Sequence, residues 1–159
     1  MVRIGYGYDI HRMAADRPLI LAGVNIPFHR GLFGHSDADV VLHAIGDALL
    51  GAAALGDLGQ HFPDNDTRFA GADSRKLLRH IKSLLAAKQY TVGNIDVTLL
   101  AEAPKLAPFR DQMRHNIAED LELSLDAVSI KFTTNEGLGE IGNSEAIAAH
   151  AIVIIEGLI

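Results

Sequence analysis

The chain has 159 residues, of which 48% are hydrophobic and 21% charged, a composition typical of one globular domain rather than of a disordered or repetitive chain. Its net charge of −6 argues against a broad surface for nucleic acid or for an anionic membrane. The absence of cysteine excludes disulfides, thiolate nucleophiles and cysteine-based metal sites, so any metal must be held by carboxylates and by the 8 histidines.

The first half of the chain combines short strands with one long helix. Its hydrophobic pattern predicts a strand over residues 2–8 and one or two short strands over residues 19–26, interrupted at Gly23. Residues 38–55 are an alanine-rich helical pattern, and Ser36 followed by Asp39 predicts a capping box at the start of this helix. Residues 56–71 are rich in Gly, Pro, Asp and Asn, which predicts a loop.

The second half alternates helices and strands. We predict an amphipathic helix over residues 74–88, a strand over 94–101, a helix opened by Pro108, a strand over 128–132, a glycine-rich loop over 133–144 and a buried strand over 146–155. Residues 1–159 are therefore expected to form a single α+β (mixed α/β) domain, in which helices cover one face of a mixed sheet. Adjacent apolar pairs such as Leu99–Leu100 and Ile154–Ile155 place apolar side chains on both sheet faces, so we expect the open face to pack against other subunits.

No segment predicts targeting or insertion into a membrane. The longest apolar run, residues 146–155, contains His150, and at roughly ten residues it is far shorter than the ~20 that a spanning helix needs. The first residues lack the apolar core of a signal peptide. We therefore expect a soluble, cytoplasmic protein.

A carboxylate and two imidazoles form a candidate metal site. Asp9 and His11 are two residues apart in a predicted extended segment, so their side chains point to the same side. They could hold a cation, or they could form only a hydrogen-bonded pair at a strand end. His43 favours the metal hypothesis, because an imidazole on so apolar a helix needs a polar partner.

Acidic residues flank that histidine on the long helix. Asp39, His43 and Asp47 recur at four-residue spacing and are predicted to form one polar stripe. A carboxylate of this stripe could hydrogen-bond a ligating histidine and fix its tautomer. The stripe could equally face solvent, and composition does not decide between these alternatives.

Two loops are candidates for binding an anionic ligand. His35 and Ser36 precede the long helix, whose free N–H groups favour an anion, although Ser36 could act only as a cap. The polar loop over residues 61–66 suits a lid or a specificity loop, or a plain surface connection.

Polar residues also follow two predicted strands. Thr133, Thr134, Asn135 and Glu136 come directly after one strand, and Lys105 follows another. Loops at strand ends often carry function, although turn formation alone would account for these residues.

Several short stretches recur in an order and spacing typical of one enzyme family. They are GYDIHR at 7–12, GHSDADVVLH at 34–43, DALLGAAALGDLG at 47–59, FPDND at 62–66, GADSR at 71–75, AEAPKLAP at 101–108 and KFTTNE at 131–136. With these stretches the chain resembles the 2-C-methyl-D-erythritol 2,4-cyclodiphosphate synthases, the cyclases of the non-mevalonate isoprenoid pathway. The resemblance extends over about residues 3–149.

The resemblance implies a homotrimer in which the sheets of three subunits face one another around a threefold axis and the active sites lie at subunit interfaces. It implies Zn²⁺ on Asp9, His11 and His43, and a second cation, Mg²⁺ or Mn²⁺, on Glu136 and the substrate phosphates. It also implies His35 and Thr134 as catalytic residues. The implied substrate-binding residues are Asp9, His11, His35, Ser36, Asp57, Leu58, Gly59, Phe62, Pro63, Asp64, Asn65, Asp66, Ala101, Lys105, Leu106, Ala107, Thr133, Thr134, Asn135 and Glu136.

The implied reaction is a phosphorus–oxygen lyase reaction. The 2-phosphate of 4-diphosphocytidyl-2-C-methyl-D-erythritol 2-phosphate attacks the β-phosphorus, releases CMP and closes the cyclic diphosphate. Such a reaction needs positioning and charge neutralisation rather than a protein nucleophile. Two alternatives remain open, a metal-dependent phosphohydrolase and a non-catalytic nucleotide-binding trimer.

The chain departs from the family pattern after Glu136. Many bacterial members carry an aromatic residue and an arginine where this chain has Glu140 and Asn143. In those members the two residues are associated with a cavity on the trimer axis that can hold isoprenoid diphosphates. We therefore predict that this chain does not bind such ligands there.

Overall fold

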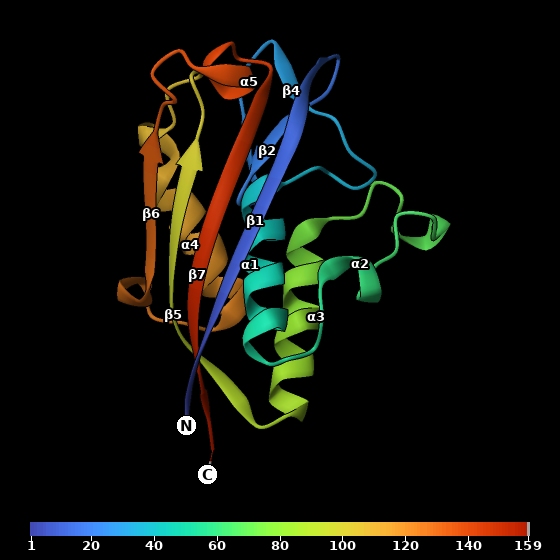
Figure 1. The fold of residues 1–159 in the computed structure, drawn as a ribbon, viewed down its shortest axis with the longest axis vertical. Coiled ribbons are helices and arrows are strands. Elements are labelled where there is room, and N and C mark those ends of the chain that lie inside the picture. Colours follow the sequence, from blue (N-terminus) through green and yellow to red (C-terminus); the bar gives the residue numbers. More distant parts are fainter. Residues whose placement is uncertain (159) are drawn as a thin grey trace.

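The fold is described by a computed structural model, which covers residues 1–158. The main sheet has five strands in the order β4-β1-β7-β5-β6 (Figure 1). Its strands are β1 (Val2–Ala15), β4 (Arg30–Leu32), β5 (Tyr90–Leu100), β6 (Val128–Thr133) and β7 (Ala146–Gly157). The pair β5–β6 is parallel and the other pairs are antiparallel, so the sheet is mixed as predicted.

A separate two-stranded hairpin joins β1 to β4. It consists of β2 (Leu19–Leu21) and β3 (Val24–Ile26), which confirms the predicted interruption at Gly23. Gly23 has a φ of 74°, in the left-handed region that favours glycine.

Three longer helices cover one face of the main sheet (Figure 1). They are α1 (Val40–Ala52), α3 (Ser74–Ala87) and α4 (Arg110–Leu121). Shorter helical segments are α2 (Leu58–His61), α5 (Gly139–Gly142) and the 3₁₀ turns η1 (Thr67–Phe69), η2 (Ala107–Phe109) and η3 (Leu125–Ala127). The predicted α+β fold is therefore confirmed. Among residues 1–158 there is no helix of the length and apolarity that crossing a membrane requires.

Close contact between α1 and β1 brings His43 next to the strand that carries Asp9 and His11. A Cβ atom on Gly7 would lie 1.9 Å from the carbonyl oxygen of Ala44, and one on Gly5 would lie 1.8 Å from that of Ala48. Only glycine lets the helix approach this strand so closely. Consequently His43, one residue before Ala44, lies against the strand that carries Asp9 and His11.

The predicted capping box is wrong. The N-cap of α1 is Asp39, whose carboxylate accepts a hydrogen bond from the N–H of Leu42. Ala38 has a φ of 58°, so the helix cannot start at residue 38. The hydroxyl of Ser36 instead accepts from the N–H of Ala38. At the other end Ala54, with a φ of 57°, stops the helix before residue 55.

Other element boundaries also differ from the predictions. Strand β1 continues to Ala15 because pairing with β7 reaches Arg12 and pairing with the unpredicted β4 covers Met13 to Ala15. The predicted loop over residues 56–71 contains α2 and η1, whose N-caps are Asp57 and Asp66. The predicted loop over residues 133–144 contains α5.

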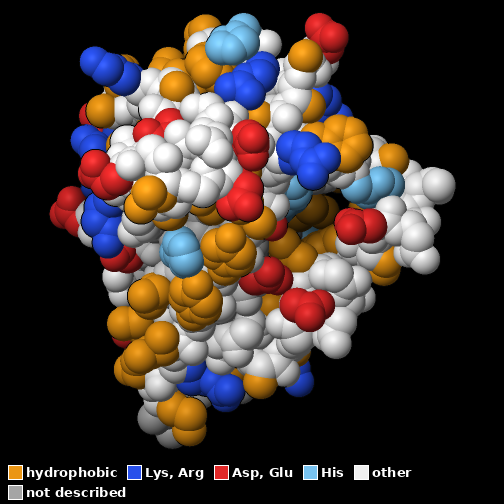
Figure 2. All heavy atoms as spheres, turned by 45° about the horizontal axis from the view of Figure 1, so that its top comes forward, with side chains coloured by type: hydrophobic (Ala, Val, Ile, Leu, Met, Phe, Trp, Pro, Cys, Tyr) orange, Lys and Arg blue, Asp and Glu red, His pale blue; other side chains and the backbone are white. Residues whose placement is uncertain are grey.

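The sheet face opposite the helices exposes apolar side chains in the single chain. Ile4 is 70% exposed and Tyr6 58%, and both alternate along β1 with the glycines that contact α1. Tyr8, Ile10 and Ile152 are exposed as well. Hydrophobic side chains gather in the lower left of the surface view (Figure 2). Contiguous exposed apolar surface of this kind marks an interaction site.

Candidate active site

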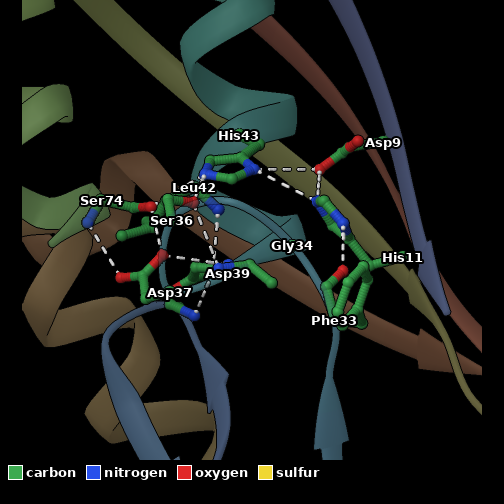
Figure 3. A network of polar contacts seen from close by, with 12 residues as sticks. Asp9, His11, Phe33, Gly34, Ser36, Asp37, Asp39, Leu42, His43 and Ser74 are labelled. Atoms are coloured by element: carbon green, nitrogen blue, oxygen red, sulfur yellow. Dashed lines mark hydrogen bonds and ion pairs between the residues drawn. The ribbon is translucent and has the colours of Figure 1, made fainter. Parts of the chain in front are cut away.

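Asp9, His11 and His43 form the only cluster among residues 1–158 in which three or more acidic or imidazole side chains could hold a metal ion. The Oδ2 atom of Asp9 lies 2.7 Å from Nε2 of His11 and 3.2 Å from Nδ1 of His43. The two imidazole nitrogens lie 3.4 Å apart. Strand β1 and helix α1 thus bring together residues that are more than thirty positions apart in the sequence (Figure 3).

The second nitrogen of each imidazole is held by a fixed partner. Nδ1 of His11 lies 3.1 Å from the carbonyl oxygen of Phe33, to which it can only donate. Nε2 of His43 lies 2.8 Å from Oγ of Ser74 and, more distantly, 3.2 Å from Oγ of Ser36. If both outer nitrogens carry the proton, the nitrogens that face Asp9 are unprotonated and free to ligate a metal.

Asp37 completes this arrangement around His43 (Figure 3). Its carboxylate accepts hydrogen bonds from both the hydroxyl and the N–H of Ser74. Because the hydroxyl proton of Ser74 is directed to Asp37, Ser74 can accept the proton of His43 Nε2. The sequence analysis assigned no role to Asp37 or Ser74, although both lie in stretches shared with the family. The GADSR stretch was the signal that could have identified Ser74.

These ligand atoms suit a small divalent cation. Tetrahedral coordination with bonds of 2.0–2.1 Å separates ligand atoms by about 3.3 Å, close to the spacings of His43 Nδ1 from the other two ligands. Asp9 and His11 are 2.7 Å apart, as in a hydrogen-bonded pair, but the convergence of His43 on the same carboxylate oxygen favours the metal hypothesis over a simple strand-end pair. A candidate Asp-His-His site for a divalent metal is therefore present.

Electrostatics also couple the three side chains in the metal-free protein. Burial tends to raise the pKa of Asp9, but hydrogen bonds and charge from His11 and His43 outweigh burial and lower it. Burial tends to lower the pKa of His43, yet its hydrogen bond to Asp9 and the nearby negative charges leave that pKa raised. The cluster is an environment that stabilises positive charge beside Asp9.

For Asp39, neither alternative for the predicted acidic stripe on α1 is correct. The Asp39 side chain turns away from the imidazole, and its carboxylate accepts from the N–H groups of Ala22, Gly23 and Leu42. Asp39 is completely buried, so it does not face solvent. Asp47 accepts from the N–H of Leu58 at 2.8 Å and thereby fixes the start of α2.

A cavity of about 310 Å³ surrounds the metal cluster. It is lined by Asp9, His11, Gly34, His35, Ser36, His43, Asp47, Leu58, Gly59, Phe62, Asp64, Phe69 and Leu77. Most of the residues predicted from the first half of the chain meet here. The predicted Asp57, Pro63, Asn65 and Asp66 do not line this cavity.

Those four residues belong to the segment that borders the cavity. Asp57 caps α2 by accepting from the N–H of Gln60, and the carboxylate of Asp66 accepts from Arg68. The ring of Phe62 packs edge-on against Phe69 at a centroid distance of 5.4 Å.

Arg17 supports the loop that carries His35 and Ser36. Its guanidinium donates to the carbonyl oxygens of Leu32, Gly34 and Ser36. Sequence reasoning missed this residue, because nothing local to Arg17 indicates contact with a loop fifteen or more positions away.

The residues predicted from the second half of the chain lie at a different cavity, of about 570 Å³. It is lined by Leu99, Ala101, Glu102, Pro104, Lys105, Leu106, Ala107, Pro108, Arg110, Phe132, Thr133 and Thr134. Parallel pairing of β5 with β6 brings the ends of both strands to one edge, and the N–H of Ala101 donates to the carbonyl of Thr133. The half-buried Asn135 and the exposed Glu136 follow and do not line this cavity.

The two cavities share no lining residue. Glu136 is not part of the Asp9 cluster either. The structure thus does not bring all predicted site residues together within one chain. It forms two groups, one around the metal cluster and one at the ends of β5 and β6.

Fold and site together define an α+β protein with a candidate metal site and a second cavity at the ends of two parallel strands. Residues 2–156 match the YgbB family, and the chain belongs to this family.

Relatives and solved structures agree with this assignment. The 2-C-methyl-D-erythritol 2,4-cyclodiphosphate synthase of Geobacter metallireducens is 58% identical over 155 residues, covering 98% of this chain and 99% of the relative. The bifunctional IspDF of Campylobacter jejuni superposes with a TM-score of 0.96 at 40% identity, covering 99% of this chain but 43% of that longer chain. The CDP complex of IspF from Plasmodium falciparum has a TM-score of 0.87 at 34% identity, covering 99% and 97% of the two chains.

Proposed function

We propose that this chain is a cyclising enzyme that forms 2-C-methyl-D-erythritol 2,4-cyclodiphosphate and CMP from 4-diphosphocytidyl-2-C-methyl-D-erythritol 2-phosphate. The observation that carries the proposal is the Asp9–His11–His43 cluster inside a chain 58% identical to a synthase of that name. The reaction makes the chain a phosphorus–oxygen lyase of isoprenoid precursor synthesis. An oxygen of the 2-phosphate bonds to the β-phosphorus, while the bond from that phosphorus to the oxygen of CMP breaks.

Two cation positions are proposed, as the resemblance implies. Asp9, His11 and His43 would hold Zn²⁺, for which two imidazoles and one carboxylate leave a coordination position open. The carboxylate of Glu136 would hold Mg²⁺ or Mn²⁺, which prefer oxygen ligands and share them with phosphates. Bound cations supply charge neutralisation at the phosphate oxygens.

The remaining residues of the first cavity would position the methylerythritol phosphate part. His35 and Ser36 stand at the edge of the metal cluster, where they can donate to a phosphate. Two segments would enclose the polyol. They are the start of α2, with Asp57, Leu58 and Gly59, and the following loop, with Phe62, Pro63, Asp64, Asn65 and Asp66.

The second cavity would hold the cytidine diphosphate part. The CDP complex of the Plasmodium falciparum relative supports a ligand that contains cytidine diphosphate. Backbone groups of Ala101, Lys105, Leu106 and Ala107 would contact the base. Thr133, Thr134 and Asn135 would contact the diphosphate, with the Thr134 hydroxyl donating to the oxygen that carries charge as CMP leaves.

We propose a homotrimer, which the resemblance to the synthases implies and which the separation of the two cavities supports. One substrate carries both parts, yet the chain presents their sites without a shared lining residue. The exposed apolar face of β1 and β7 offers the surface on which subunits could pack. In a closed trimer, the metal cluster of one subunit would meet the nucleotide cavity of its neighbour.

Product analysis tests the proposal. The purified protein is incubated with the cytidine substrate, Zn²⁺ and Mg²⁺, and the products are resolved by phosphorus NMR. We expect equal amounts of CMP and cyclic diphosphate. Linear phosphate products would indicate a phosphohydrolase, and an unchanged substrate with a folded, metal-loaded protein would indicate a non-catalytic binding protein.

A further inference from the structure

Glu102 is an acidic residue inside the second cavity whose role no motif predicted. It lies two residues after Leu100, the last residue of β5, and is half-buried. Its Oε1 atom accepts hydrogen bonds from the N–H groups of Asn135 at 2.8 Å and of Gly137 at 3.2 Å. These donors lie more than thirty positions away, in the turn that follows β6.

The turn over residues 134–137 has the form of an anion-binding concavity. Glu136 and Gly137 have φ values of 54° and 73°, so consecutive residues adopt the left-handed conformation. The N–H of Glu136, between the two donors to Glu102, donates to Oγ1 of Thr134 at 3.2 Å. Successive N–H groups in such turns form nests that bind anions. Here the chain's own carboxylate occupies the nest, so the nest is not available to a substrate phosphate.

This contact fixes two proposed site residues at once. The Thr134 hydroxyl is oriented because its oxygen accepts from Glu136, and the Glu136 backbone is fixed because its neighbours donate to Glu102. Hydrogen bonds to an ionised acceptor are stronger than those between neutral groups. Without the carboxylate, a glycine-containing turn with left-handed residues would sample other conformations.

We propose that Glu102 is a positioning residue that holds Thr134 and Glu136 ready for the diphosphate and its cation. The inference deepens the proposed function and rests on it. Glu102 neither contacts the reacting atoms nor ligates a metal in this account, since its Oε1 atom is engaged by the turn. Glu102 therefore raises the affinity for ligands that carry a diphosphate, and contributes little to the affinity for a nucleoside alone.

The test compares CDP with cytidine as probes, both titrated with Mg²⁺ present and followed by NMR. In Glu102→Ala we expect the affinity for CDP to fall about tenfold, the effect of one charge-assisted hydrogen bond, while the affinity for cytidine stays within about twofold. Glu102→Gln keeps a carbonyl oxygen and is expected to stay within about threefold of wild type. Glu102→Asp keeps the charge but is too short, so it should behave like Glu102→Ala.

A surface variant controls for the loss of a carboxylate elsewhere on the protein. Glu119→Ala removes an exposed carboxylate of α4 and should leave both affinities unchanged. Equal losses for CDP and cytidine in Glu102→Ala would show a general collapse of the cavity and overturn the proposal, as would undiminished CDP affinity in both Glu102→Ala and Glu102→Asp. If wild type binds neither probe, the proposed function itself fails.

Discussion

His43 and Ser74 are joined by a hydrogen bond of 2.8 Å between Nε2 and Oγ, on the side of the imidazole opposite to Asp9. The hydroxyl of Ser74 in turn donates to Asp37. The bond therefore orients the ring, and a proton held on Nε2 leaves Nδ1 free to ligate a metal. Metal affinity thus depends on a residue that does not itself bind the metal.

The first prediction concerns Ser74→Ala. Loss of the nearer acceptor leaves His43 Nε2 only the Ser36 hydroxyl at 3.2 Å, so the ring is held less firmly and the Zn²⁺ affinity should fall about tenfold. Competition with a chromogenic chelator measures this affinity. Ser83→Ala is the matched control, because Ser83 lies on the same helix and its hydroxyl bonds only its own turn, at the carbonyl of His80. Equal Zn²⁺ affinity in wild type and Ser74→Ala would refute the role assigned to Ser74.

A second prediction concerns the stability supplied by Asp39. The Asp39→Ala variant leaves the N–H groups of Ala22, Gly23 and Leu42 without their acceptor, so the free energy of unfolding should fall by about 3 kcal/mol or more. Urea denaturation at a fixed protein concentration measures it. As a control, Asp73→Ala removes an exposed N-cap that accepts from Arg75 alone and should cost about 1 kcal/mol.

The contribution of Asp39 should also depend on pH. Complete burial, aided by the charge of Asp37, raises the pKa of Asp39 from 3.8 to about 6 against the opposing effect of its N–H donors. Folding therefore favours the protonated form, so the contribution of this group is complete below about pH 4 and declines as the pH rises through 6. The difference in unfolding free energy between wild type and Asp39→Ala should be larger at pH 5 than at pH 7. A difference that grows with pH would contradict this assignment.

A third prediction tests the contact between β1 and α1. Gly7→Ala would place a Cβ atom 1.9 Å from the carbonyl oxygen of Ala44, so the helix must move and stability should fall by about 3 kcal/mol or more. Displacement of His43 should also weaken metal binding. Gly51→Ala, on the same helix, meets no atom within 4 Å and should be neutral or stabilising by up to about 1 kcal/mol. Similar melting temperatures for Gly7→Ala and wild type would argue against the close packing.

Much of the fold and of the metal site could be predicted from local pattern. The two-residue spacing of Asp9 and His11 on a strand and the isolated His43 on an apolar helix favoured a metal site, but left a simple Asp–His hydrogen bond as an alternative. Hydrophobic periodicity located α3 to within one residue of its observed end at Ala87. These features depend on residues that are close together in the sequence, so the local sequence pattern is enough to predict them.

What could not be predicted depends on contacts between distant segments. Ser36 and Asp39 are both good caps, and the choice of Asp39 follows from its burial under the β2–β3 turn at Ala22 and Gly23. The pairing of Glu102 with the turn after β6 likewise follows from strand order. The separation of the predicted site residues into two cavities is also a property of the tertiary structure alone.

The most direct test of the account is complementation between two inactive variants. His43→Ala lacks the metal half, and the double variant Thr134→Ala/Glu136→Ala lacks the nucleotide half; each alone should be inactive. When the two are refolded together in equal amounts, about a quarter of the interfaces in random trimers combine two intact halves, so about a quarter of the wild-type activity should return. If mixed trimers form and no activity returns, both halves of each active site belong to one subunit and the account is wrong.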